Sequence, residues 1–129
     1  VKPDPIILDG PFNYGDLRIS PLAVEHATVE THGFLFEMRG HPPIAYIPDV
    51  KHVPRETAEL IRGVDILILD ALRPSTHPTH LSIHEARALV EDLGASRAWH
   101  THLGHDNDHA TLGATLPPHV RVAHDGLRI

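Results

Sequence analysis

The stretch VDILILD, residues 64–70, decides the fold. It is an almost unbroken run of β-branched residues and leucines, and its length and composition predict a strand over Val64–Leu69 that is buried on both faces. Asp70 follows directly, so its carboxylate comes at the end of a strand, where the loops of a sheet gather around sites.

The chain beyond this strand alternates helices and strands. Ser82-Ile83-His84-Glu85 has the pattern of a capping box, and apolar residues at helical spacing continue to Gly94, which ends the predicted helix. A strand over Arg97–Thr101 and a short helix over Asp108–Leu116 follow. We expect Val120–Ala123 and Leu127–Ile129 to form a terminal hairpin.

The chain before residue 64 predicts a small antiparallel meander. Its strands are Leu17–Val24, Gly33–Met38 and Ile44–Ile47, separated by turn residues. A short helix over Pro54–Arg62 then ends at Gly63. The sequence contains no internal repeat and no long linker, so we expect residues 1–129 to form a single domain of the α+β class.

Composition excludes several classes of protein. The net charge is −6, and no cysteine is present for disulfides or thiolate ligands, which leaves histidine and carboxylate for any metal chemistry. No basic field favours nucleic acid, and no apolar run approaches the roughly 20 residues of a membrane span. We expect a cytoplasmic protein that binds neither. The segment Val1–Phe12 predicts an extended entry without a start signal, as in a processed or truncated product.

Histidine is the unusual residue here, with 13 in 129 positions. The histidines are scattered and concentrate between His77 and His109, unlike a purification tag. Several titratable residues come just past predicted strand ends, where they are expected to converge on one site. They are His26, Asp49, the pair His77 and His80, and the pair His102 and His105.

The order of short motifs resembles the phosphoribosyl 1,2-cyclic phosphate phosphodiesterase branch of the metallo-β-lactamase superfamily. The resemblance covers nearly the whole chain and is most specific from Asp70 to Asp125, although Ala123 stands where the family has tyrosine. The motifs are Val24-Glu25-His26, Tyr46-Ile47-Pro48-Asp49, Asp70-Ala71-Leu72-Arg73, His77-Pro78-Thr79-His80-Leu81-Ser82, Thr101-His102-Leu103-Gly104-His105-Asp106 and Ala123-His124-Asp125-Gly126.

The resemblance implies a two-metal site of zinc or manganese. His26 and His102 match metal histidines, Asp49 matches the bridging aspartate, and His80 matches the acid/base histidine. Physical chemistry agrees, because a ligand shared by two cations needs two charged oxygens and imidazoles suit the remaining positions. The metals would activate a water to attack phosphorus, and a histidine would protonate the departing ribose oxygen.

Other residues have supporting interpretations. Asp70 or Asp106 would accept a hydrogen bond from a ligand imidazole, and His77 is a further supporting residue. His105 either contacts the substrate phosphate or packs beside Asp106. Arg73 pairs either with a phosphate or with Asp70, and we expect the ion pair with Asp70. The remaining histidines are expected to be solvated or structural: His32, His41, His52, His84, His100, His109, His119 and His124.

Each site residue also has an ordinary interpretation. His26 alone would be a strand-end histidine, Asp49 a turn residue after proline, and His80 the residue before a capping box. Their family order favours the site, which the early His-x-His-x-Asp-His motif would complete. That motif does not occur in this sequence.

We therefore expect the C-terminal half of a four-layer αββα hydrolase that is inactive as this chain alone. Its exposed apolar sheet face should be covered by the missing half or by a second copy. The alternatives are a tRNA-processing nuclease of the same superfamily and a non-catalytic histidine-rich metal-binding or scaffold module.

Overall fold

The computed structural model describes residue 7 and residues 9–129, and a seven-stranded sheet organises them. Most of the predicted extended entry Val1–Phe12 lies outside the described residues. The strands follow one another across the sheet in chain order. They are β1 (Phe12–Tyr14), β2 (Leu17–His26), β3 (Val29–Met38), β4 (Ile44–Ile47), β5 (Ile66–Asp70), β6 (Arg97–Thr101) and β7 (Val120–Val122).

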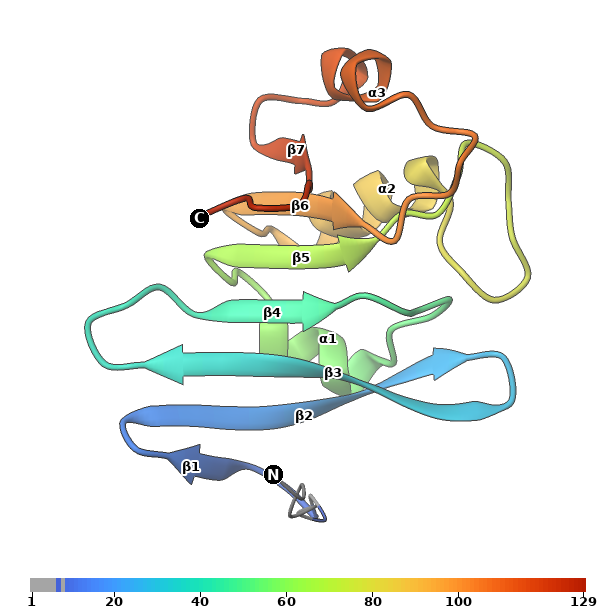
Figure 1. The fold of residues 1–129 in the computed structure, drawn as a ribbon. Helices are drawn as coiled ribbons and strands as arrows, with labels where there is room; N and C mark the ends of the chain where they lie inside the picture. Colours follow the sequence, from blue (N-terminus) through green and yellow to red (C-terminus); the bar gives the residue numbers. More distant parts are fainter. Residues whose placement is uncertain (1–6, 8) are drawn as a thin grey trace, which may run out of the picture.

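The sheet changes character at β4 (Figure 1). Strands β1 to β4 pair antiparallel, and β2 and β3 form one long hairpin in which Leu17 lies opposite Met38 and His26 opposite Val29. From β4 to β7 every pairing is parallel. The predicted meander is therefore confirmed, and it continues into a parallel sheet whose strands all end at one edge.

Helices connect the parallel strands. They are α1 (Arg55–Ile61), α2 (Ile83–Leu93) and α3 (His109–Thr115). The predicted capping box is present at α2, where Ser82 Oγ accepts from the Glu85 amide and the Glu85 carboxylate accepts from the Ser82 amide. Gly94 ends the helix at φ 66°, a left-handed conformation that glycine adopts without a Cβ clash.

The two faces of the sheet differ in cover. In Figure 1, α1 and α2 lie behind the sheet, and the buried residues Leu22, Ile47, Leu67 and Val90 pack together there. The opposite face carries apolar side chains that stay partly or well exposed, Tyr46 at 38% among them. The others include Ile19, Phe34, Phe36, Ile44 and Ile68. An uncovered apolar face, as the sequence predicted, is thus present in the described chain.

Two predictions on the fold need correction. The terminal hairpin is wrong: β7 pairs parallel with β6, and the structure assigns no strand to Leu127–Ile129. Residues 124–127 do turn, with Gly126 at φ 80°, but the chain does not return alongside β7. The predicted burial of residues 64–69 is confirmed at Val64, Ile66, Leu67 and Leu69, whereas Asp65 is exposed and Ile68 is only partly buried because it faces the uncovered side. Within the described residues, no helix is long and apolar enough to cross a membrane.

Candidate metal centre

Residues from separate elements meet at the edge where the parallel strands end. His26 is the last residue of β2, Asp49 follows β4, and His102 follows β6. His80 lies in the loop that joins β5 to α2. The sheet places these positions together because β2 runs in the same direction as the parallel strands β4 to β6, so that the carboxyl ends of all four strands share one edge.

The side chains of this cluster lie close enough to share a ligand. His26, Asp49 and His80 each offer one donor atom, and these atoms all lie within 4.8 Å of one another. His80 Nδ1 lies 3.5 Å and His102 Nε2 lies 3.7 Å from Asp49 Oδ1. The ring centroids of His26 and His102 are 4.6 and 4.8 Å from that of His80. Asp49 is therefore the carboxylate around which the histidines gather.

Asp70 supports the cluster through two hydrogen bonds. Its Oδ2 accepts a hydrogen bond from His80 Nδ1 at 2.8 Å and another from the Val50 amide at 3.1 Å. The carboxyl group is fully buried, and burial raises its pKa although both hydrogen bonds act in the opposite direction. Because Nδ1 of His80 donates to Asp70, its Nε2 is left free to act toward a ligand or substrate.

His26 is held in the same manner. Its Nδ1 lies 2.9 Å from the backbone oxygen of Thr79, and a carbonyl oxygen only accepts, so Nδ1 carries the proton and Nε2 is free. Neighbouring His77 accepts from the Thr79 amide at 3.3 Å, and its ring centroid is 5.0 Å from that of His80. Desolvation, with the nearby Arg73, lowers the pKa of His77.

His102 has a strained backbone. Its φ is 58°, in the left-handed region that residues with a Cβ seldom adopt. Such strain costs on the order of 1 kcal/mol and gathers at functional positions. A polar cavity of about 270 Å³ adjoins it, lined by Thr101, His102, Leu103, Ala123, His124 and Asp125.

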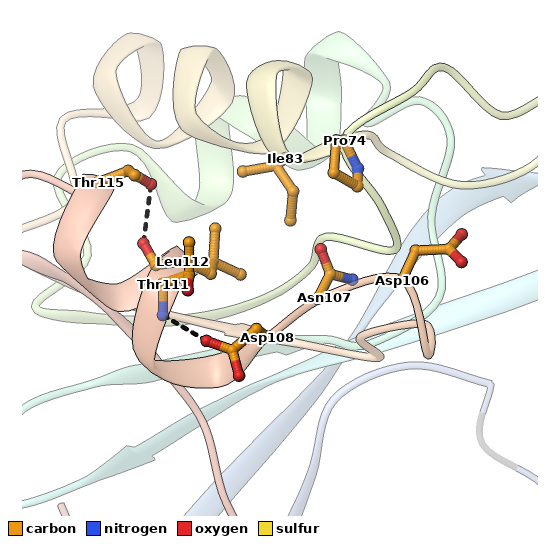
Figure 2. A pocket seen from close by; sticks show the side chains of 8 residues that line it. All are labelled: Pro74, Ile83, Asp106, Asn107, Asp108, Thr111, Leu112 and Thr115. Atoms are coloured by element: carbon orange, nitrogen blue, oxygen red, sulfur yellow. Dashed lines mark hydrogen bonds between the residues drawn. The ribbon is translucent and has the colours of Figure 1, made fainter.

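Three sequence-predicted residues do not reach the cluster. Asp106 lies at the edge of a different pocket, where its carboxylate points away from Leu112 (Figure 2). His105 is exposed, and its predicted phosphate contact remains a prediction. The expected pairing of Arg73 with Asp70 is wrong: among the described residues no such ion pair forms, and Arg73 Nη2 donates to the Thr76 backbone oxygen instead.

Sequence reasoning missed the Lys51–Glu85 ion pair beside the site, and it expected His100 only to be solvated or structural. Lys51 Nζ lies 2.7 Å from Glu85 Oε1, and this bond, with those from Ser82, lowers the pKa of Glu85 to about 2. The capping box predicted Glu85 only as a partner of Ser82. His100 is fully buried on the helix-covered face, where burial lowers its pKa to about 4 and neither ring nitrogen has a partner among the described residues.

The donor set fits a divalent metal. The His26 imidazole, whose Nδ1 is already bound to a backbone oxygen, and the His102 imidazole, whose Nε2 lies 3.7 Å from the partly exposed Asp49 carboxylate, are ligands that zinc and manganese accept. Ligand atoms on a tetrahedral zinc lie roughly 3.4 Å apart, so side chains whose ligand atoms lie within 4.8 Å of one another would move closer on binding.

Comparison with known proteins identifies the family and the fold. A family model described as the beta-lactamase superfamily domain matches residues 1–103. The crystal structure of a diphosphatase from the PhnP family superposes with a TM-score of 0.85 at 33% identity, covering 94% of this chain and 46% of that one.

More distant structures share the fold. The metallo-beta-lactamase fold protein YhfI from Bacillus subtilis superposes with a TM-score of 0.76 at 21% identity, over 92% of this chain and 52% of that protein. Zinc-bound PqqB from Methylobacterium extorquens gives 0.71 at 21% identity, over 95% and 53%. The chain thus spans about half of these structures, which confirms the predicted α+β fold as a part of that larger architecture.

One further relative is named as a transferase. A Porphyromonas gingivalis protein named octanoyltransferase is 31% identical over 98% of this chain, and the match spans 24% of that protein.

Proposed function

The chain belongs to the beta-lactamase superfamily, and from this premise we propose that it is the part of a metal-dependent phosphodiesterase that supplies His26, Asp49, His80 and His102. The observation that carries the proposal is the position of Asp49. Its carboxylate is the common neighbour of His80 and His102, and His26 lies beside it. A non-catalytic histidine-rich module would not require a carboxylate at that point.

The metal and the chain have separate tasks. Bound zinc or manganese would supply the activated water that attacks phosphorus. His26, Asp49 and His102 would hold the metal. These three residues would bind one cation. The second of the two expected cations would need ligands that this sequence does not supply, because His-x-His-x-Asp-His does not occur in it.

His80 is proposed as the acid that protonates the departing oxygen. Asp70 fixes its Nδ1 and therefore directs Nε2 outward, and the side chain remains 13% exposed at the site. This arrangement gives the ring one orientation and one tautomer, as a proton donor requires. His80 is also within reach of the metal-ligand group, so its replacement separates the two roles: loss of the acid would lower turnover, whereas loss of a ligand would lower metal content.

The proposed substrate is a cyclic phosphate ester of ribose. The similarity at 33% identity to a diphosphatase of the PhnP family supports a phosphorus-centred reaction. The polar cavity beside His102 offers room for the part of the substrate that is not hydrolysed. Human tRNase Z, short form, is 17% identical, which supports the shared fold alone, so the nuclease alternative has no further support.

Acyl transfer is not favoured. The match to the protein named octanoyltransferase spans 24% of it, so the name of the whole does not identify what the matching part does. The cluster around Asp49 offers metal ligands and a proton donor, and no cysteine exists in this sequence to act as an acyl carrier.

The uncovered sheet face is proposed to pack against the other half of the parent protein. Phe34, Phe36 and Tyr46 would become buried there, and the same contact would bring the remaining metal ligands to Asp49. A second copy of the chain is the alternative occupant.

The test is hydrolysis of a ribose 1,2-cyclic phosphate by the full-length parent protein loaded with zinc or manganese. We expect hydrolysis that is lost in Asp49→Ala and retained in His32→Ala, an exposed histidine of β3. His80→Ala should lower kcat at least 100-fold with metal content retained. Full activity in Asp49→Ala would overturn the proposal.

A further inference from the structure

The four site residues stand on four separate segments, and three of these segments share a further support. His26 ends β2, Asp49 follows β4, and His80 precedes α2. Asp70 links the second of these to the third through Val50 and His80. Asp70 makes no bond to the first segment, which is joined to the His80 loop by the single bond from His26 Nδ1 to the Thr79 backbone oxygen.

Lys51 connects to the first segment through its backbone. Its amide donates to the Glu25 oxygen at 2.7 Å, and the Glu25 amide donates to the His52 oxygen at 2.9 Å. Glu25 precedes His26 directly, and Lys51 comes two residues after Asp49. The backbone at Lys51 therefore ties the segment that carries His26 to the segment that carries Asp49.

The side chain of Lys51 reaches the third segment. Its Nζ lies 2.7 Å from Glu85 Oε1, with the two side chains only 30% and 34% exposed. The other oxygen of Glu85 accepts from the Ser82 amide and from Ser82 Oγ, both at 2.7 Å. Ser82 is fixed in turn two residues after His80. Glu85 therefore binds Ser82, at the end of the His80 loop, with one carboxylate oxygen and Lys51 with the other.

We propose that the Lys51–Glu85 ion pair is a positioning pair. It holds the Asp49 segment against the His80 loop, whose Thr79 oxygen binds the His26 ring, and it thereby sets the spacing of His26 and Asp49 and the metal affinity of the site. The inference rests on the proposed function for the identity of the metal ligands. It adds residues that neither bind the metal nor touch the substrate. Outer supports of this kind affect metal affinity by about 10- to 100-fold when they are removed.

The experiment measures zinc binding to the 129-residue chain by isothermal titration calorimetry, together with thermal unfolding of the metal-free protein. Because the chain has 13 histidines, the site-specific component is defined as the binding that Asp49→Ala abolishes. Lys51→Met keeps the length of the side chain and leaves the Ser82–Glu85 capping box intact. We expect it to weaken this component about 10-fold with a nearly unchanged melting temperature.

Two controls separate positioning from stability and from charge. Gly94→Ala forces a Cβ into φ 66° at the far end of α2, so it should lower the melting temperature and leave zinc affinity unchanged. Glu91→Gln removes an acidic group of the same helix that pairs with His119 at 3.2 Å, away from the site, and should change neither quantity. Lys51→Arg should restore most of the affinity, since its guanidinium still reaches Glu85.

The outcomes distinguish the inference from its premise. Zinc affinity in Lys51→Met equal to that of the unaltered chain would overturn the positioning role while leaving the metal site in place. Zinc binding that Asp49→Ala does not reduce would overturn the proposed function, and the inference with it. A Gly94→Ala affinity loss as large as that of Lys51→Met would show that helix stability alone sets the affinity, which also contradicts the proposal.

Discussion

The antiparallel and parallel regions of the sheet support their site residues differently. In the parallel region, the buried carboxylate of Asp70 holds both His80 and the backbone beside Asp49. In the β2–β3 hairpin, His26 is held by one bond from its ring to Thr79 and by backbone bonds at Glu25. In the parallel region a buried side chain therefore fixes the site residues, whereas in the hairpin His26 is fixed by contacts with neighbouring loops.

This difference teaches where the site is sensitive. The regions join at the β3–β4 pairing, where Phe34 lies opposite Tyr46. A substitution at the junction should destabilise both regions. A substitution at Asp70 should affect mainly the parallel region, and one at the contact between α1 and β2 should affect mainly the hairpin.

The largest effect is expected at the junction itself. A Cβ added at Gly33 would lie 2.7 Å from the Tyr46 backbone oxygen and 2.8 Å from Ile47 Cγ1, so β3 and β4 would have to separate. Gly33→Ala should lower the free energy of unfolding by about 3 kcal/mol, measured by urea denaturation. Gly113→Ala is the matched control, because open space surrounds that position in α3, and it should be neutral or stabilising by up to about 1 kcal/mol.

The next effect breaks the parallel region alone. Asp70→Ala leaves the Val50 amide and His80 Nδ1 without their acceptor inside the protein, and should lower the free energy of unfolding by roughly 2–3 kcal/mol in the same urea assay. Asp65→Ala, at an exposed position before β5, should change it by less than about 0.5 kcal/mol. An Asp70→Ala protein as stable as the Asp65→Ala protein would show that Asp70 does not organise this region.

A smaller effect loosens the hairpin from its helix. Thr57 is buried on α1, and its Oγ1 donates to the Ala23 backbone oxygen of β2 at 2.7 Å. Thr57→Val keeps the shape and removes this bond, with an expected loss of about 1 kcal/mol. Amide hydrogen exchange should accelerate in β2 and β3 more than in β5 and β6. Equal acceleration in both regions would contradict their independence.

The smallest effect is a pH dependence at the Lys51–Glu85 pair. The pKa of Glu85 is lowered from 4.5 to about 2, first by Lys51, so its charged form stabilises the fold at pH values above about 4.5 and this contribution is lost as the pH falls toward 2. The unaltered chain should therefore exceed Glu85→Gln in stability near pH 6, and the gap should shrink toward pH 2. A gap that stays constant would mean that the carboxylate charge is not involved.

Much of the fold was predictable because local signals agree with the final structure. The capping box and Gly94 fixed α2 at both ends, and the run before Asp70 indicated a buried strand. The terminal hairpin was mispredicted because a turn at His124–Gly126 resembles a hairpin turn, whereas β7 finds its partner in β6, a contact distant in sequence.

The residues of the site were predictable from two signals, their positions after strand ends and the order of the family motifs. His26, Asp49, His80 and His102 follow strands that meet at one edge, and the structure brings them together. Long-range side-chain bonds leave no such signal: nothing in the sequence links Lys51 to Glu85, or shows that Arg73 turns to Thr76 rather than to Asp70.

The most direct test of the central claim is anomalous diffraction at the zinc edge from crystals of the chain grown with zinc. We predict a peak bounded by Asp49, His26 and His102. Peaks confined to other histidines, such as the neighbouring pair His109 and His124, with none beside Asp49, would contradict the account.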